Sequence, residues 1–572
     1  MGGCGRIFQV SGYSRILPVK TGFGIIRVKC RFRLWILILT SDILETPMRQ
    51  DNPHHKLLRS TAVISAPTLL SRILGYIRDM LQANYLGTSG SADAFTIAYV
   101  IPNLLRRLTG EGALTAAFIP VFTEVKEKET QERLWRFANI FFFDMTLIIA
   151  LLAVVGILMS PVLVKLIAPG FSEIPGKTGL TAALTRIMFP YVFLVSLAAF
   201  SMAVLNSFRK FFVPAFTPVL FNLAIITAAL AFASRADEPA FVFAAGVVAG
   251  GVLQLAFQIP FLWKKGMRFK ARLSFRHPAV RRVGQLMIPG IFGVGISQIN
   301  FAISRMIASI LEEGSVSSLY YASRVEELTL GVFSIALSIA LLPSFSEQAA
   351  YKDIEGMKKT LNFAFKLIFF VTLPAAAGLL TLSRPIMQVL FQRGVFDVQS
   401  TAMSASCLFF FSFGLPFISG VKILAPAFYS LKDTKTPVIV AFLVMISYIS
   451  LSFILMRSLR VGGIALALSL ASVLNFLLLL VFLERKIGKL SKKSMAVHFI
   501  RCGAMAVVMG ILVKLFFGMF VFDGLDFMKQ LGVLLASIMI GIIAYLGMSL
   551  LFSHEDLRRL KDAFSRDKIL KE

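Results

Sequence analysis

Charged residues are scarce in this sequence of 572 residues, at 16% against 57% hydrophobic residues, and the mean hydropathy is +0.78. A water-soluble fold cannot bury so much apolar surface, so this balance excludes the ordinary soluble classes. In a bilayer every backbone N–H and C=O group needs an internal partner, which only helices and closed barrels provide. Apolar runs such as residues 438–456 are continuous rather than alternating, so they indicate helices.

Cysteines and catalytic motifs are also scarce. The four cysteines, Cys4, Cys30, Cys407 and Cys502, show no CxxC spacing, so they predict neither a disulfide framework nor a metal site. The chain has no GxxxxGK[ST] phosphate-binding loop, and no pairing of a nucleophile with a base stands out. We therefore expect a transporter rather than an enzyme, with no cofactor and no bound metal.

What the sequence has is a series of apolar stretches, each near the roughly 20 residues that a bilayer-spanning helix needs. They predict an all-α polytopic membrane protein with about fourteen transmembrane helices. The predicted spans are 61–86, 92–123, 134–168, 179–207, 213–233, 240–263, 283–311, 317–346, 360–391, 399–430, 435–456, 461–484, 495–520 and 528–553.

The two ends of the chain lie outside these spans. Residues 1–55 form a basic extension whose one apolar run is too short to span, and we interpret it as disordered or as a mis-assigned start, with Met48 as an alternative first residue. Residues 554–572 are expected to be a cytoplasmic tail.

The formal net charge of +28 first suggests a nucleic-acid partner, but the basic residues gather in short loops. Two connections after even-numbered spans, residues 264–282 and 484–494, hold eight and five Lys or Arg residues. Three connections after odd-numbered spans, residues 86–94, 234–240 and 311–318, hold one between them. Since cytoplasmic loops are enriched in Lys and Arg, both termini are predicted to be cytoplasmic, and no nucleic-acid partner is expected.

An internal repeat gives the organisation of the spans. The sequence AAFIPVFTE at 116–124 matches IALLPSFSE at 339–347, and SFRKFFVP at 207–214 matches SLKDTKTP at 430–437, both at a spacing of 223 residues. An even number of spans per repeat gives two halves of the same orientation.

The repeat predicts two six-helix lobes, residues 56–265 and 266–490, followed by a C-terminal pair of helices in residues 491–553. A binding site is expected between the lobes.

Ionisable residues inside spans cost energy and generally face a protein interior or an aqueous cavity, so they are the best functional candidates. The first two spans of each predicted lobe carry most of them. Because Arg outnumbers the nearby acids, and because the planar guanidinium group suits phosphate oxygens, the cavity is expected to bind an anionic ligand. Arg78, Arg106 and Arg324 are the preferred ligand candidates.

For several of these residues, a structural role remains an alternative to ligand binding. Arg72 with Asp79, and Arg107 with Glu111, could be pairs within one helix that only stabilise packing. Asp144 in the third span could bind a cation or a proton, or could pack helices together. Asp93, at the start of the second span, could be a helix N-cap.

The segment 69–124, LLSRILGYIRDMLQANYLGTSGSADAFTIAYVIPNLLRRLTGEGALTAAFIPVFTE, resembles the opening of the MurJ (MviN) family of lipid II flippases, in the wider superfamily of multidrug, oligosaccharidyl-lipid and polysaccharide exporters. Family-like segments such as YYASRVEE (320–327) and KILAPAFYSLKDTKTPV (422–438) extend the resemblance over residues 55–553. The resemblance implies a multi-pass protein of the bacterial inner membrane that moves lipid II, an undecaprenyl-diphosphate-linked peptidoglycan precursor, to the outer leaflet.

The resemblance also implies residue roles. Arg72, Arg78, Arg106 and Arg324 match substrate-binding arginines, and the cavity-lining positions are Ser71, Asp79, Asp93, Asn103, Arg107, Glu111 and Glu327. Ser323 departs from the pattern, because some members have Asp there. A sodium site known in some members is not carried over, since spans nine to twelve have no Asp or Glu in their apolar interiors.

Three readings remain. The first is a lipid II flippase that works by alternating access, with cell-wall synthesis proteins as further partners. The second is a flippase for another polyprenyl-diphosphate-linked oligosaccharide, which needs the same chemistry. The third is a non-transporting scaffold for cell-wall assembly, in which the buried charges only pair with one another. Exporters of organic cations fit poorly, because their cavities call for uncompensated acids.

Overall fold

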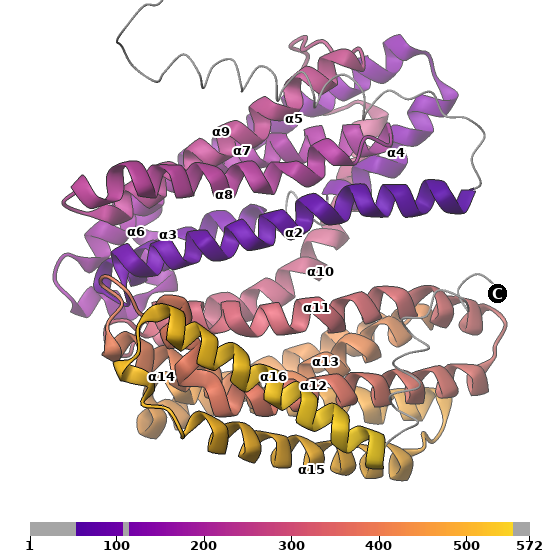
Figure 1. Cartoon of the computed structure of the whole chain (residues 1–572). Coiled ribbons are helices and arrows are strands. Elements are labelled where there is room, and N and C mark those ends of the chain that lie inside the picture. The colour runs from indigo at the N-terminus through magenta and orange to yellow at the C-terminus, as the bar shows by residue number, and fades with distance from the viewer. Residues whose placement is uncertain (1–52, 107–113, 553–572) are drawn as a thin grey trace, which may run out of the picture. The chain divides into compact units, whose positions relative to one another are not determined.

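The computed structural model describes residues 53–106 and 114–552 (Figure 1). The predictions for the N-terminal extension up to residue 52 and for the C-terminal tail lie outside these residues. The chain divides into two compact units, and everything below concerns the larger one, residues 63–572. In its described part all regular elements are α-helices or short 3₁₀ turns, and none is a strand, which confirms the all-α prediction.

The helices follow the predicted spans closely. We call the following eight the first helix group: α2 (Pro53–Leu86), α3 (Gly90–Arg106), α4 (Leu114–Lys128), α5 (Gln131–Leu158), α6 (Ser160–Ile167), α7 (Lys177–Ser207), α8 (Phe212–Phe232) and α9 (Pro239–Lys264). The second helix group is α11 (Ser315–Ala350), α12 (Ile354–Phe391), α13 (Val398–Ser430) and α14 (Lys435–Ile487). Between the groups lies α10 (Pro278–Ala308), and α15 (Lys492–Phe517) and α16 (Phe527–Phe552) end the described chain.

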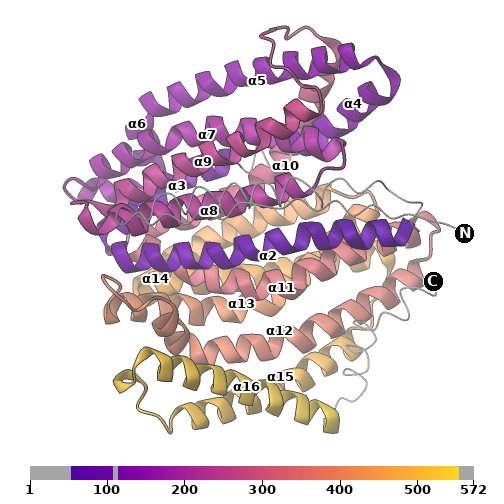
Figure 2. The same cartoon turned by 45° about the horizontal axis from the view of Figure 1, so that its top comes forward.

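Each helix group has its own apolar core. Phe118 and Phe200, from α4 and α7, pack edge to face in one core. Phe365 and Phe476, from α12 and α14, pack in the core of the second group. Figure 2 shows α15 and α16 beside α12, and a smaller apolar cluster joins these three helices.

The connecting helix α10 belongs to both cores. Val283 near its start is buried in the core of the first group, whereas Ile307 near its end is buried in the core of the second. In Figure 1 the helix accordingly runs between the two groups, and it contacts α4 and α5 on one side and α11 and α14 on the other. A relative movement of the groups therefore has to be accommodated along α10.

Within the described residues, nine helices are long and apolar enough to cross a membrane, or ten if the bent helix α11 counts as one span. The number is below fourteen for two reasons. Helices α2, α3, α4 and α10 are not among the nine, and α3 and α4 are short, at 17 and 15 residues. The two predicted spans on either side of residue 460 form one continuous element, α14, of 53 residues.

A break inside α14 keeps those two predicted spans distinct. Arg460 has φ 50° and ψ −132°, which is not helical. Gly463 lies so close to the carbonyl oxygen of Leu455 that an added Cβ would come within 2.4 Å of it. Only glycine fits there, so Gly463 determines where α14 can break.

The internal repeat is visible in the turns that precede α8 and α14. Arg209 and Lys432, which are 223 residues apart, both have positive φ, 58° and 59°. Their amides donate to the carbonyls of Asn206 and Tyr429, again equivalent positions, at 2.8 and 3.0 Å. Two matched turns of unusual backbone geometry support the repeat more strongly than the apolar sequence matches did.

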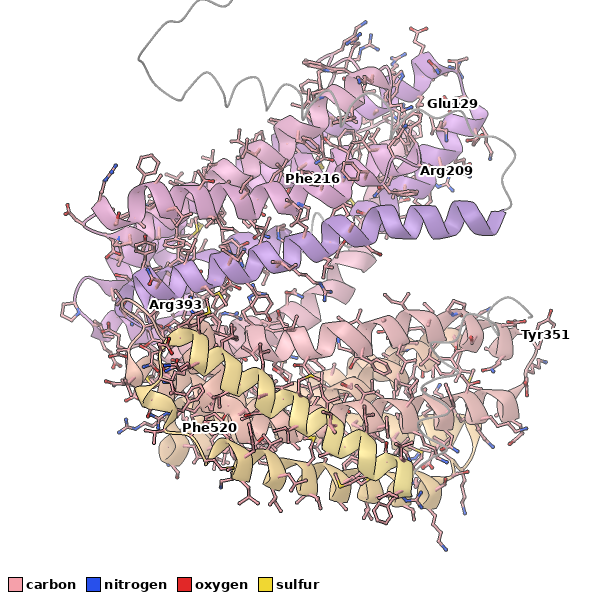
Figure 3. The ribbon with its side chains drawn as sticks, viewed as in Figure 1. Glu129, Arg209, Phe216, Tyr351, Arg393 and Phe520 are labelled. Carbon is pink, nitrogen blue, oxygen red and sulfur yellow. The ribbon has the colours of Figure 1, made fainter. Side chains whose placement is uncertain are left out.

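The connections between helices lie at two opposite ends of the described helices. Figure 3 shows Glu129, Arg209 and Tyr351, in connections after even-numbered predicted spans, toward one end. Arg393, in a connection after an odd-numbered span, and Phe520, the last residue of the thirteenth predicted span, lie toward the other end. This is the alternation that the loop charges predict.

Asp144 forms a hydrogen bond with the segment between α9 and α10. Its Oδ1 accepts a hydrogen bond from the backbone N–H of Ser274 at 2.9 Å, and Asn139 on the same helix accepts one from the N–H of Lys270 at 2.8 Å. Asp144 is 2% exposed. The structure thus favours a packing role over a cation site, although its partner is a connecting segment rather than a helix.

Candidate functional site

A hollow opens between the two helix groups. It encloses about 840 Å³ of empty space, including the part that is open to solvent. Residues from six helices line it: Arg78, Gln82, Phe95, Thr96, Tyr99, Val100, Asn103, Leu104, Ile225, Val247, Gln298, Phe301, Ala302, Arg305, Tyr320, Ser323, Arg324 and Glu327. The predicted site residues Arg78, Asn103, Arg324 and Glu327 are among them, so helices distant in sequence do converge on one cavity.

The carboxylate of Asp79, on α2, holds the centre of the site. It is 3% exposed and receives Arg78 Nη2 at 2.7 Å on Oδ1. From the second helix group, the hydroxyl of Tyr320 donates to the same oxygen at 2.9 Å, and Arg324 Nε lies 3.5 Å from Oδ2. One buried carboxylate therefore joins two arginines that are 246 positions apart in the sequence.

Arg324 lies on a polar stripe of α11. Its Nη1 donates to Glu327 Oε2 at 2.9 Å, and its guanidinium group lies 5.0 Å from the centre of the Tyr320 ring. The three residues are four and three positions apart, which places them on one helix face, as the sequence predicts. Tyr76 of α2 donates its hydroxyl to the backbone carbonyl of Arg324 at 2.6 Å. Both the side chain and the backbone of Arg324 are thus held across the hollow.

Asn222 of α8 organises the polar face of α2. Arg78 Nη1 donates to its side-chain oxygen at 3.1 Å, and its Nδ2 donates to the backbone carbonyl of Ser71 at 2.9 Å and to the Ser71 hydroxyl at 3.3 Å. Ser71 is therefore not on the cavity wall, but it is tied to Arg78 through a shared partner.

Two further predicted arginines lie near the wall without lining it. Arg106 donates through Nε and Nη2 to the side-chain oxygen of Asn103, at 3.1 and 3.0 Å. Arg72 is exposed and lies over Gly331 of α11, where an added Cβ would come within 2.8 Å of its Nη1. Arg107 and Glu111 fall in residues 107–113, outside the described part, so the predicted pair between them stays a prediction.

The charge balance differs in detail from the sequence prediction. Asp79, which the sequence pairs with Arg72 as one alternative, lies instead between Arg78 and Arg324. In the described residues, the guanidinium groups of Arg78, Arg305 and Arg324 and the carboxylate of Glu327 line the hollow, and the buried carboxylate of Asp79 lies beside it. One positive charge remains in excess, and the carboxylates occupy the same guanidinium groups that an anionic ligand would use.

Asp93 does not line the hollow. It is 1% exposed and pairs with Lys177 of α7, whose Nζ lies 2.9 Å from Oδ2. The carboxylate also accepts from the N–H groups of Gly314 and Ser317 at 2.8 and 2.9 Å, and from the Ser317 hydroxyl at 2.8 Å. The sequence offers Asp93 as a cap of its own helix, but the carboxylate caps the N-terminus of α11 in the other helix group.

Further contacts between the groups surround Asp93. The Val395 N–H donates to the Asn84 carbonyl at 2.9 Å, and the hydroxyls of Thr88 and Ser400 lie 2.8 Å apart. The N–H of Gly90 donates to the carboxylate of Glu313. The helix groups are therefore closed against each other at the end where α3 and α11 begin.

Sequence reasoning missed several of these residues. Asn222, Thr96, Tyr99 and Gln82 are uncharged polar residues in apolar helices, and Lys177 stands at a helix start where a surface lysine is ordinary. The one usable signal was the amide of Asn222 in the run FTPVLFNLAIITAAL, because a polar amide in a span needs a partner. In the described residues, no group of three or more His, Cys, Asp or Glu side chains could hold a metal ion.

Comparison with known proteins agrees with this architecture. The family model for the lipid II flippase MurJ matches residues 82–532. A probable lipid II flippase MurJ of Vibrio cholerae is 36% identical over 435 residues, 74% of this chain and 82% of the relative. The lipid II flippase MurJ of Burkholderia cenocepacia is 35% identical and covers 75% and 84%.

Solved structures give the same result at the level of the fold. A lipid II flippase MurJ in an inward closed conformation superposes with a TM-score of 0.73 at 28% identity, covering 86% of this chain and 99% of that one. An inward-facing multidrug transporter of the MATE family has a TM-score of 0.63 at 12% identity, with 76% of this chain and 99% of that one covered, which shows a shared fold only.

Proposed function

Because this chain belongs to the MurJ family of lipid II flippases, we propose that it carries lipid II from the inner to the outer leaflet of the bacterial inner membrane. The hollow between the helix groups receives the diphosphate and its sugars, and the polyprenyl tail stays in the lipid. The protein works as a transporter, with no bond made or broken.

One observation carries the proposal. Arg78 and Arg324 come from different helix groups, line an open hollow, and meet at the buried carboxylate of Asp79 beside it. A diphosphate offers several anionic oxygens in place of the single carboxylate of Asp79, and the guanidinium fork binds such oxygens in pairs. The headgroup would thus hold both helix groups at once.

The contacts around Asp93 support alternating access. We assign the end where α3 and α11 begin to the periplasmic side, because the loops at the opposite end are the basic ones. With that orientation both termini are cytoplasmic and the groups are closed on the periplasmic side. The headgroup would enter from the cytoplasm, and release would require the Asp93 contacts to open.

The membrane potential can supply energy for this step. Moving one unit charge through 100 mV yields about 2.3 kcal/mol. A potential that is negative inside drives the anionic headgroup outward, so transport needs no bound nucleotide.

The test is substitution of the two arginines. Arg78→Ala and Arg324→Ala proteins, reconstituted in vesicles, are expected to lose most of the translocation of lipid II, because each removes one half of the diphosphate contact. Arg384→Ala is the matched control: Arg384 lies 56% exposed in a loose pair with Asp523, away from the hollow. Full translocation by an Arg78→Ala or Arg324→Ala protein that inserts normally would refute the site.

The other readings predict different results. A flippase for a different polyprenyl-diphosphate-linked oligosaccharide would leave lipid II in place and move its own lipid with the same dependence on Arg78 and Arg324. For a scaffold, depletion of the protein would leave the distribution of lipid II between the leaflets unchanged. Accumulation of lipid II in the inner leaflet is the outcome that the proposal requires.

A further inference from the structure

Glu326 is a buried acid that the proposed transport mechanism does not use. It follows Arg324 on α11 by two positions, and its side chain is 5% exposed. Its Oε1 is shielded from solvent and has no hydrogen-bond partner. The next residue, Glu327, faces the hollow and contacts Arg324. Consecutive helix residues point about 100° apart, so the two carboxyl groups lie on different faces of α11.

Lys422 of α13 connects the two faces. This half-buried lysine interacts electrostatically with both Glu326 and Glu327. Among the described residues, Glu327 and Lys422 are the charged groups that act on Glu326, from its own helix and from the packed helix α13. An ion pair joins Arg324 to Glu327 at the hollow, and electrostatic interactions extend from Glu327 through Lys422 to Glu326.

The chemistry of this site selects its ligand. An ionised carboxylate with an unpartnered oxygen inside a protein core in a membrane is costly, and uptake of a proton removes that cost. A metal cation is disfavoured, because the ammonium group of Lys422 already supplies a positive charge and one carboxyl group offers too few oxygen ligands. A proton is the cation that fits.

We propose that Glu326 is a proton-binding site coupled to the substrate arginine. When Glu326 is ionised, it competes with Glu327 for Lys422, and Glu327 stays on Arg324. When Glu326 is protonated, Lys422 pairs with Glu327 and releases Arg324 toward the headgroup. The added positive charge acts in the same direction, so protonation strengthens the binding of an anionic ligand.

This coupling rests on the proposed function, and linkage makes it measurable. Coupling between two sites is reciprocal. If one proton is taken up with each headgroup, the dissociation constant of the headgroup therefore rises about tenfold for each unit by which the pH is raised, in the range where Glu326 titrates. Because the proton and the headgroup bind together, the coupling strengthens substrate binding. The free energy for outward movement still comes from the membrane potential.

The experiment measures the binding of lipid II and of undecaprenyl diphosphate to the purified full-length protein over a range of pH. The wild-type protein should show the tenfold change per pH unit, and Glu326→Gln should abolish that slope. Glu355→Gln, which removes an exposed glutamate paired with Lys358, should keep it. Equal slopes in the wild-type and Glu326→Gln proteins would overturn the coupling.

Infrared spectroscopy tests the site without any lipid. A carboxyl C=O band that appears as the pH is lowered, and that is missing in Glu326→Gln, is the expected result. If no such band depends on Glu326, the proton site is wrong. If the band is present but neither lipid binds at any pH, the proton site stands and the proposed substrate is wrong.

Discussion

The buried pair of Asp93 and Lys177 gives the sharpest prediction. Asp93 is 1% and Lys177 5% exposed, and the ammonium group also lies 4.4 Å from the centre of the Phe171 ring. Asp93→Asn keeps the size of the side chain, but it replaces one of the two accepting oxygens by an NH2 donor and leaves the lysine charge buried without a counter-charge. Removing one partner of a buried pair costs about 3–5 kcal/mol, so we expect the free energy of unfolding to fall by that amount.

The measurement is a double-mutant cycle of unfolding in mixed detergent micelles. Asp93→Asn and Lys177→Met should each be strongly destabilising, whereas the double variant should lose less than the sum, with a coupling energy of about 1–3 kcal/mol. The control is the exposed pair of Asp526 and Lys529, whose side chains are 63% and 71% exposed. Asp526→Asn should cost less than about 1 kcal/mol.

The same variant tests the role of the pair in closing the two helix groups. Asp93 binds Gly314 and Ser317 of α11 as well as Lys177, so part of its free energy lies between the groups. Asp93→Asn should therefore increase the reaction of a cysteine introduced at Ser317 with a water-soluble thiol reagent. A cost no larger than that of Asp526→Asn, with no gain in reactivity, would refute the reasoning.

Two further predictions follow from side chains outside the hollow. Asp144→Ala removes the acceptor of the Ser274 N–H, so a protease should cut the segment between α9 and α10 faster than in the wild type, with unchanged cutting as the contrary result. Partial burial raises the pKa of Asp433, but hydrogen bonds from Lys486 and Thr436 outweigh it and lower that pKa to about 2. The stability from this group is therefore present above about pH 4, the ordinary pKa of Asp, and is lost as the pH falls toward 2. Thermal unfolding of Asp433→Asn should show a weaker acid dependence than the wild type in that window, and identical curves would contradict the assignment.

The sequence predicted the helices well because the membrane imposes a simple rule. Each predicted span contains described helix, although 92–123 and 134–168 each hold two helices, and the boundary near residue 460 corresponds to a real break. Spans that contain charged residues are harder to predict. Spans rich in Arg and Asp, such as α2, look like poor membrane helices by composition, yet they carry the site.

The partners of these charges could not be predicted, because pairing depends on tertiary distance. The contact of Tyr320 with Asp79 joins residues 241 positions apart, whereas the sequence suggested Arg72 as the partner of Asp79. Asp93 shows the same limit: its position at a helix start indicated a local cap, but the helix that it caps belongs to the other group.

The sharing of Asp79 between two arginines has a consequence for the transport cycle. Guanidinium groups left without a counter-charge in a membrane cavity would cost several kcal/mol each. Asp79 and Glu327 supply that charge from within the protein, so Arg78 and Arg324 do not depend on a substrate for a counter-charge. In the proposed cycle a diphosphate would displace these carboxylates rather than water alone, which would weaken its net binding. A flippase has to release what it binds, and an internal competitor on the same arginines lowers the barrier to that release.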